Sequence, residues 1–443
     1  MDDKQQVQDE KREARKKRRI RNQILAYVML ILLMLAAAAG VVAAVQFLKN
    51  ESKREQEVLD DTKDKIDSML GDEGEVEIPT PTPEPPVELT WEQKLDEIIN
   101  AGVIEVMPLE DKVAGLFIVT PEALTGVGTA IRAGEGTQKA LSKYAVGGIV
   151  YFSKNIQNED QLKEMLKNTE FYSKYNNLFL AVDEEGGSVA RVAKAGIGPK
   201  VDDAQKIGAT GDANNAFIAG ITIGTTLSGL GFNLDFAPVA DIASVEDSVM
   251  AKRAYGTDAQ TASPYVTAML QGLQEQGVTG CLKHFPGNGA TTQDTHTGIA
   301  VSNRTVEEFR TEEFAVFQAG IDAGARMIMV SHMAAPALTG DNTSCSLSKI
   351  VVTDILREEL GFNGVIITDA LNMSAISEYN SSEDAAIMAL KAGCDMLLMP
   401  EDFEAAYNGV LQAVRDGVIS EERINDSLRR IYRIKWADKL EQE

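Results

Sequence analysis

The chain has 443 residues, which is enough for one large domain or two to three small ones, and its 44% hydrophobic and 25% charged residues are ordinary for a globular protein. The net charge of −24 argues against a nucleic-acid partner. Cys281, Cys345 and Cys394 are an odd number at wide spacings with no CxxC pair, which argues against a disulfide framework and against a zinc site.

The N-terminal region has the features of a membrane anchor. Residues 1–23 contain nine Lys/Arg and five Asp/Glu, a net charge of +4 that leaves −28 for the other 420 residues. No charged residue occurs in the 27 positions from Asn22 to Leu48, and roughly 20 apolar residues are enough to span a hydrocarbon core. The basic segment Lys11–Arg21 precedes this run, so we expect the N-terminus in the cytoplasm and the C-terminal part outside it.

A cleaved signal peptide is the alternative, with a cleavage site inside the alanine-rich stretch Ala36–Ala44. The apolar part of a signal peptide is usually about 7–15 residues long, and this one is much longer. We therefore predict a basic cytoplasmic tail over residues 1–21 and an uncleaved single-pass anchor over residues 22–48. The localisation expected from this is the cell membrane, with the C-terminal domain on the extracytoplasmic side.

Residues 49–90 have the composition of a linker. They are first highly charged and then, from Gly71 to Glu88, acidic and rich in Pro and Thr. A segment of this kind cannot bury a core and is expected to be an extended spacer. From Trp91 onward the sequence changes to that of a compact α/β domain, predicted over residues 91–443.

Short apolar runs and helical patterns alternate through this domain, which predicts a parallel sheet closed as a (β/α)8 TIM barrel. A doubly wound open sheet is the rival fold, but neither a GxGxxG fingerprint nor a P-loop occurs. The predicted strands are Gly115–Thr120, Gly147–Phe152, Leu178–Asp183, Phe232–Val239, Val278–His284, Arg326–His332, Gly364–Asp369 and Asp395–Pro400. The predicted helices include Glu159–Tyr175, Asn214–Leu230, Ala259–Gln276, Val306–Ala323 and Ser346–Leu360.

Polar residues close several of these strands, at the position where a barrel carries its active site. They are Asp183, Lys283–His284, His332 and Asp369. The segment Gly277–Thr297 stands out, because it holds two of the three histidines of the chain and breaks after the strand into a loop with Pro and Gly.

The residue types in these positions suit acid–base and nucleophilic chemistry. In the loop, Asp294 and His296 are two residues apart, so in an extended segment the carboxylate can hold the imidazole. Asp369 ends an apolar strand with no basic residue nearby, which suits a nucleophile, although a helix cap is the alternative. Asp183 with Arg191 could face a polyhydroxylated ligand or could form a surface turn. A carboxylate nucleophile and a histidine proton carrier together can cleave a glycosidic bond.

Three segments carry a resemblance to a known family. They are DEEGGSVAR at Asp183–Arg191, KHFPGNG…DTH at Lys283–His296, and LREELGFNGVIITDALNM at Leu356–Met373. From Trp91 to Lys439 the chain resembles glycoside hydrolase family 3, specifically its bacterial β-N-acetylglucosaminidase branch, whose members are β-hexosaminidases with a (β/α)8 barrel and a retaining mechanism.

This resemblance implies roles for individual residues. It implies that Asp369 is the nucleophile and that His296, paired with Asp294, is the general acid/base. It also implies that sugar hydroxyls and the N-acetyl group are held by a further set of side chains, and that neither a metal nor a cofactor is needed. That set is Asp183, Arg191, Arg253, Lys283 and His284.

One residue departs from the family pattern: Asn288 stands where a second histidine is usual, which bears on the loop conformation or the fit of the substrate. The chain also ends about 70 residues after Asp369, which favours the single-domain hexosaminidase type over the β-glucosidase relatives.

We therefore expect an exo-acting β-N-acetylglucosaminidase outside the membrane, acting on peptidoglycan fragments or similar glycans. The alternatives are a β-N-acetylglucosaminide phosphorylase, a β-glucosidase of the same family, and a catalytically inactive glycan-binding barrel.

Overall fold

The computed structural model describes residues 90–440, apart from 176–177 and 294–297. The chain divides into two units, Met1–Val87 and Glu88–Glu443, and every described residue belongs to the second. The predicted membrane span Asn22–Leu48 lies outside the described residues, so it stays a prediction. None of the helices in the described part of the chain has both the length and the apolar character needed to cross a membrane.

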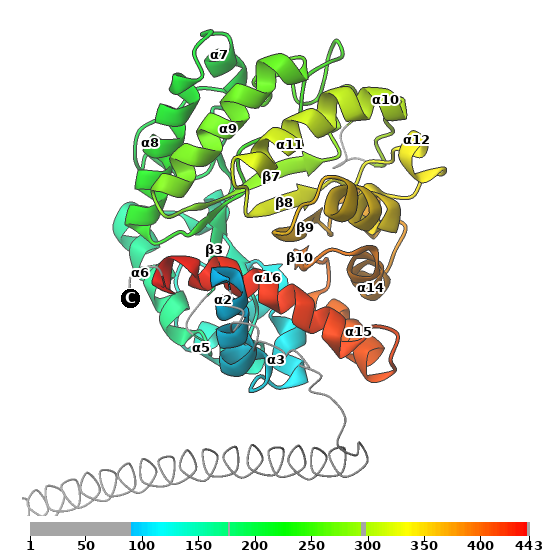
Figure 1. Ribbon diagram of the computed structural model, residues 1–443. Helices are drawn as coiled ribbons and strands as arrows, with labels where there is room; N and C mark the ends of the chain where they lie inside the picture. Colours follow the sequence, from blue (N-terminus) through cyan, green and yellow to red (C-terminus); the bar gives the residue numbers. More distant parts are fainter. Residues whose placement is uncertain (1–89, 176–177, 294–297, 441–443) are drawn as a thin grey trace, which may run out of the picture. The chain divides into compact units, whose positions relative to one another are not determined.

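Eight parallel strands close into a barrel in the order β1-β10-β9-β8-β7-β6-β3-β2, surrounded by helices (Figure 1). The predicted barrel is therefore confirmed. All eight predicted strands are present; β7 and β9 are as long as their apolar runs, and the other six are shorter. The strands are β1 Phe117–Val119, β2 Gly148–Val150, β3 Phe179–Val182, β6 Leu234–Asp235, β7 Thr279–Phe285, β8 Met327–Val330, β9 Val365–Ala370 and β10 Met396–Leu398, and a hairpin outside the barrel pairs β4 Glu184–Gly186 with β5 Val189–Ala190.

β6 is much shorter than its predicted run, Phe232–Val239, because Pro238 has no N–H to donate to a regular ladder. The chain nevertheless continues beside β7. The Cys281 N–H donates to Ala237 O at 2.7 Å, and the Lys283 N–H donates to Pro238 O at 3.2 Å. All seven residues of β7 are buried, so this strand lies at the centre of the fold.

Most predicted helices are present within a few residues of their expected ends, because polar side chains cap them. Asn158 caps α6 and Asp258 caps α9 by accepting backbone N–H groups of the first turn. The predicted helix Val306–Ala323 is divided into three segments by a π-type turn, and the predicted helix Ser346–Leu360 is largely of π type. The α-helices of the described part of the chain are α2 Trp91–Ile99, α3 Leu109–Ala114, α4 Pro121–Thr125, α5 Glu135–Lys143, α6 Glu159–Tyr172, α7 Ala204–Gly208, α8 Asn214–Leu230, α9 Ala259–Glu275, α10 Val306–Glu308, α11 Phe314–Asp322, α12 Pro336–Thr339, α13 Ser374–Ser377, α14 Ser382–Ala392, α15 Phe403–Arg415 and α16 Glu421–Leu440. The π-type segments are η1 Asn100–Ile104, η5 Phe309–Glu313 and η7 Ile350–Glu359, and the 3₁₀ turns are η2 Ser153–Asn155, η3 Ala193–Ala195, η4 Asn288–Ala290 and η6 Cys345–Leu347.

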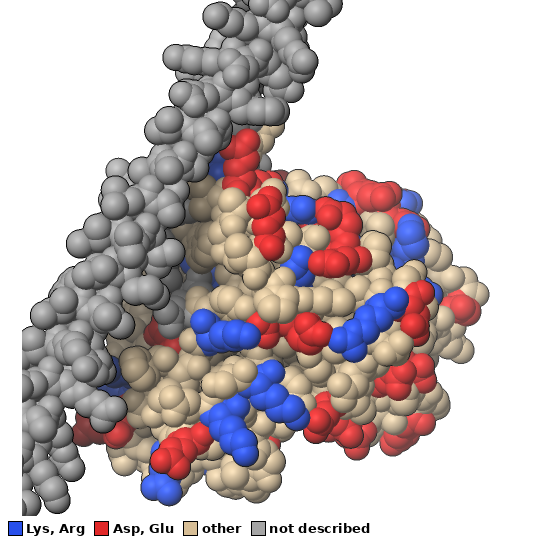
Figure 2. Space-filling view, turned by 90° about the horizontal axis from the view of Figure 1, so that it is seen from below, with Lys and Arg blue, Asp and Glu red and all other residues tan. Residues whose placement is uncertain are grey.

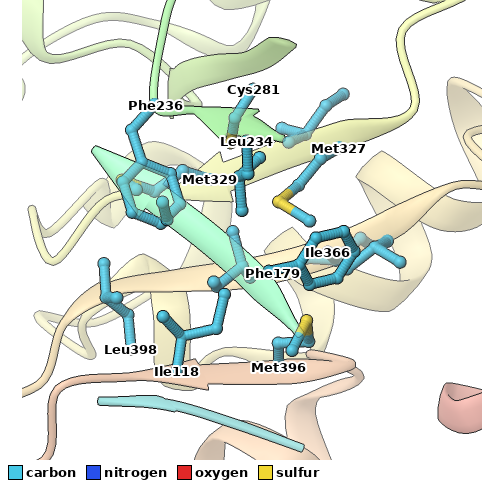
Figure 3. Packing of buried hydrophobic residues seen from close by; sticks show 14 of the residues in the cluster. Ile118, Phe179, Leu234, Phe236, Cys281, Met327, Met329, Ile366, Met396 and Leu398 are labelled. Atoms are coloured by element: carbon cyan, nitrogen blue, oxygen red, sulfur yellow. The ribbon is translucent and has the colours of Figure 1, made fainter. Parts of the chain in front are cut away.

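The inside of the barrel is filled with apolar side chains. Figure 3 shows Phe179, Leu234, Met327, Met329 and others from the surrounding strands converging on one another. A barrel packed in this way is a core and not a pore, so a ligand is confined to the ends of the strands. On the outside, the face shown in Figure 2 carries Lys and Arg side chains among Asp and Glu side chains.

A buried carboxylate, Asp395, ties the C-terminal helix to the start of β10. Asp395 is 0% exposed. It accepts hydrogen bonds from Arg357 Nη2 at 2.7 Å, Ser427 Oγ at 2.9 Å and Arg430 Nη1 at 3.1 Å. It also accepts the backbone N–H of Ile366 in β9 at 3.0 Å. One side chain thus connects β9, β10, η7 and α16.

Replacing Asp395 by Ala is expected to lower the free energy of unfolding by about 3–5 kcal/mol, because it removes a fully buried acceptor and leaves partly buried arginines without their counter-charge. Urea unfolding of the full-length chain measures this difference. The matched control is Asp202→Ala, which removes an exposed partner of Lys206 and should cost less than about 1 kcal/mol. Equal losses in the two variants would show that the buried cluster contributes no more than a surface ion pair.

Candidate active site

A cavity of about 350 Å³ opens where the barrel strands end. Its lining includes every predicted site residue that the structure describes: Asp183, Arg191, Arg253, Lys283, His284 and Asp369. The other two predicted residues, Asp294 and His296, lie outside the described residues. The structure therefore brings together residues that are up to 186 positions apart in the sequence.

The polar part of the cavity is built around the buried ammonium group of Lys283, whose side chain is 2% exposed. Its Nζ lies 2.8 Å from Asp183 Oδ1 and 2.6 Å from Glu185 Oε1. Arg253 grips the same glutamate in bidentate fashion, with Nε 2.8 Å from Oε2 and Nη2 2.7 Å from Oε1. Glu185 therefore lies between two cations, which fixes both of them toward the cavity.

These contacts keep the cluster ionised although it is buried. Burial raises the pKa of Glu185, but Lys283 and Arg253 outweigh that effect and lower this pKa to about 2. Burial lowers the pKa of Lys283, yet Asp183 and Glu185 raise it above its usual range. Fixed charges of both signs suit the hydroxyl groups of a sugar, which both donate and accept hydrogen bonds.

The β4–β5 hairpin positions Glu185 and Arg191 next to β3. Its turn contains Gly186 and Gly187 at φ values of 92° and 51°, which side chains disfavour. The Glu184 carboxylate then accepts the backbone N–H groups of Arg191 at 2.6 Å and Val192 at 2.7 Å. These bonds tie the end of the hairpin back to its first strand. This accounts for the glycines and for the first glutamate of DEEGGSVAR.

The carboxylate of Asp241 orients His284. Its Oδ2 accepts a hydrogen bond from His284 Nδ1 at 2.7 Å, so Nδ1 carries the proton and Nε2 faces the cavity side, 3.5 Å from Arg253 Nη2. Its Oδ1 accepts the backbone N–H of Asn288 at 2.6 Å. Asp241 is 1% exposed and joins the segment after β6 to the loop after β7.

Asn288, the departure from the family pattern, has a defined place in this loop. Its side chain is buried, and its Oδ1 accepts a hydrogen bond from Ser331 Oγ at 2.5 Å. The same hydroxyl accepts the Met333 N–H at 3.0 Å, so the loop is tied to the end of β8. At Gly289, a Cβ atom would lie only 1.8 Å from Ile242 O, which leaves no room for a side chain.

Asp369 ends β9 at the edge of the cavity. Its Oδ1 accepts the N–H of Ala370 at 2.8 Å. Burial raises the pKa of Asp369, but the nearby side chains of His284, His332 and Lys283 and this N–H outweigh it, and the net shift is downward. Asp369 is therefore a carboxylate at neutral pH, the form that a nucleophile needs.

His332 holds the backbone next to Asp369 in place. Its Nε2–H donates to Ala370 O at 2.9 Å, and its Nδ1 accepts from the hydroxyl of Ser346 at 2.8 Å. Burial lowers the pKa of His332, so it is neutral at pH 7. Both nitrogens are bound within the protein, which makes His332 a residue that positions the end of β9.

Sequence reasoning missed Glu185 and Asp241 as parts of the site, and it gave His332 no role although it placed this residue at a strand end where a barrel carries its active site. A signal existed for each. Glu185 shares the motif of Asp183, Asp241 follows the apolar run of β6, and His332 was noted only as a strand end. Among the described residues, no group of three or more His, Cys, Asp or Glu side chains could hold a metal ion.

The ion pairs of Glu185 predict a specific dependence of stability on pH. Its pKa is about 2 in the folded chain against about 4.5 ordinarily, so its contribution is present above pH 4.5 and is lost as the pH falls toward 2. Glu185→Gln should therefore lower the free energy of unfolding by about 3 kcal/mol at pH 7, and the difference from the unmodified chain should shrink below pH 4.5. Urea unfolding at several pH values tests this, with the exposed Glu275→Gln as control. A difference independent of pH would contradict it.

Solved structures similar to this chain include two glycoside hydrolases. A glycoside hydrolase family 3 β-N-acetylglucosaminidase from Paenibacillus sp. str. FPU-7 is similar at a TM-score of 0.71 and 31% identity, covering 76% of this chain and 64% of that one. A β-N-acetylhexosaminidase from Beutenbergia cavernae is similar at a TM-score of 0.67 and 26% identity, covering 74% of this chain and 98% of that one.

Two relatives that are similar in sequence are named as beta-hexosaminidases. Beta-hexosaminidase A of Pseudoalteromonas piscicida is 30% identical over 326 residues, which are 67% of this chain, and the chain spans 54% of that protein's length. A beta-hexosaminidase of Chromobacterium violaceum is 32% identical over 280 residues, covering 61% of this chain and 77% of the relative. Residues 108–434 match the family described as "Glycosyl hydrolase family 3 N terminal domain". The chain belongs to glycosyl hydrolase family 3.

Proposed function

We propose that the protein is a retaining, exo-acting β-N-acetylglucosaminidase. The observation that carries this proposal is the ionised Asp369 in the lining of the same cavity as the charged cluster around Lys283. The similar proteins from Pseudoalteromonas, Chromobacterium and Paenibacillus are named as hexosaminidases or as an N-acetylglucosaminidase, which supports N-acetylhexosamine as the sugar.

In the proposed reaction, an oxygen of Asp369 attacks the anomeric carbon and the bond to the leaving oxygen breaks. His296, held by Asp294, gives its proton to that oxygen. The same histidine then takes a proton from water, which attacks the glycosyl–aspartate ester and releases the sugar with its original β configuration. The roles of Asp294 and His296 rest on the family resemblance, because both lie outside the described residues.

The charged cluster would hold the sugar while this happens. Asp183 Oδ2 and Arg191 Nη2 are 3.9 Å apart, too far for a hydrogen bond, so both keep capacity for sugar hydroxyls. Lys283 and the Nε2 of His284 line the same cavity. The proposed reaction requires that the ring held by these groups turns its anomeric carbon toward Asp369 in β9.

Asp369→Asn tests the nucleophile. In the full-length chain we expect hydrolysis of a chromogenic β-GlcNAc substrate in preference to the matching β-glucoside, and a loss of at least about 10³-fold in kcat in the variant, because the amide cannot form the ester. The control is Asp322→Asn, an exposed residue on α11. Equal or greater activity on the glucoside would reassign the substrate, and a fully active Asp369→Asn would exclude Asp369 as nucleophile.

The stereochemistry and the acceptor are separate questions that one NMR time course can answer. A retaining hydrolase releases the β-anomer first, and the α-anomer appears later through mutarotation. Initial release of the α-anomer would contradict the covalent mechanism. Added inorganic phosphate should leave the product unchanged, whereas formation of a sugar 1-phosphate would identify a phosphorylase.

We also propose that the enzyme is anchored in the cell membrane and works outside it, on peptidoglycan fragments or similar glycans. The uncharged run Asn22–Leu48 behind the basic segment Lys11–Arg21 supports this location. We expect the full-length chain to stay in the membrane fraction after an alkaline carbonate wash, and a chain lacking residues 22–48 to be released. Protease added to intact spheroplasts should degrade the catalytic part; protection from it would place that part inside the cell.

A further inference from the structure

Met399, in the wall of the active-site cavity, has a strained backbone. Its φ is 46°, a left-handed conformation that is rare for a residue with a side chain, and Pro400 follows it. The Met399 N–H donates to Ile118 O at 2.9 Å, and its carbonyl accepts the N–H of Asn372 at 3.0 Å. Both backbone groups are thus fixed by the neighbouring strand β1 and the segment after β9, which hold the residue in this conformation.

The barrel places Met399 opposite the charged cluster. Asp183, Glu185 and Arg191 follow β3, Arg253 follows β6, and Lys283 lies in β7, which are neighbouring strands. In the closed order of eight strands, β10 is four places from β6, which is the far side of the barrel. Met399 follows β10 directly and packs partly against the core.

The cavity wall on Met399's side combines apolar side chains with the polar side chains of Asp369 and Asn372. Its apolar members are Met399, Leu398 in β10 and Met373 after β9. The side of the cluster therefore offers mainly charges and hydrogen bonds, whereas the side of Met399 adds a thioether and aliphatic surface next to Asp369. A ligand that fills both sides must carry an apolar group on the edge that faces away from the charged cluster.

An N-acetylhexosamine carries such a group, because an acetamido substituent, which ends in a methyl group, replaces a hydroxyl of the parent hexose. We propose that Met399 is a specificity-determining residue whose side chain forms the apolar wall against this methyl group. The proposal rests on the proposed function and deepens it, since it names the residue that distinguishes the N-acetylated sugar from the plain hexose.

The strain fits this role. Glycine would adopt φ = 46° without strain but would leave the wall without a side chain. Unfavourable backbone conformations of this kind persist where the surrounding structure holds them, and they cluster at ligand sites. At position 399 the chain keeps both the strained conformation and a long, adaptable thioether, which can follow the contour of a small apolar group.

The test compares Met399→Ala and Met399→Leu on chromogenic β-GlcNAc and β-glucoside substrates, in the full-length enzyme. Met399→Ala should lower kcat/KM for β-GlcNAc about tenfold, as expected for losing contact with one small apolar group, and should change kcat/KM for the glucoside less than about twofold. Met399→Leu keeps an apolar side chain and should keep most of the preference. Met388→Ala, which truncates an exposed methionine on α14, is the matched control and should change neither value.

Met399→Gly tests the strain, because it removes the same side chain as Met399→Ala but relaxes φ. It should lose selectivity to the same extent and melt about 2 °C higher than Met399→Ala. An equal or lower melting temperature would show that the conformation is not strained.

The kinetic outcomes separate this inference from the function on which it rests. If the unmodified enzyme does not prefer β-GlcNAc, the proposed function fails. If it does, and Met399→Ala keeps that preference or loses activity on both sugars equally, only the role of Met399 is overturned.

Discussion

The active site depends on a single buried ammonium group, that of Lys283. A cation inside a protein is tolerated only when carboxylates surround it, and Asp183 and Glu185 supply them from the end of β3 and from the hairpin that follows. Glu185 in turn fixes Arg253 from beyond β6. The need to neutralise one lysine thus sets the positions of segments from three neighbouring strands and makes the polar half of the cavity rigid.

The other half of the site is held by hydrogen bonds to strand ends. Asp241 joins His284 to the backbone of Asn288, and His332 holds the carbonyl of Ala370 beside Asp369. These supports have no free capacity for a ligand, but they orient the groups that do. Removing one of them would change the geometry of the site without removing any group that touches the substrate.

Much of the fold could be predicted because parallel strands buried on both faces read as short apolar runs, and the run Gly364–Asp369 corresponds to β9 within one or two residues. The polar residues at the ends of such runs could be predicted as site residues, because a barrel carries its active site where its strands end. Asp241 and Glu185 also stand near strand ends, but their partners could not be predicted, since closure of the barrel alone brings Asp241 to His284, 43 positions away. The strain at Met399 was equally hidden, because methionine has no sequence preference that reports a positive φ.

The filled interior of the barrel also has a consequence for the order of events. Because side chains such as Phe179 and Met327 block any passage through the barrel, substrate, leaving group and water must all use the mouth at the strand ends. In the proposed reaction, water reaches the glycosyl–aspartate ester only after the leaving sugar has moved out of that mouth. A second sugar that occupied the vacated space would receive the glycosyl group in place of water, so the same architecture that degrades a glycan at low sugar concentration would build one at high concentration.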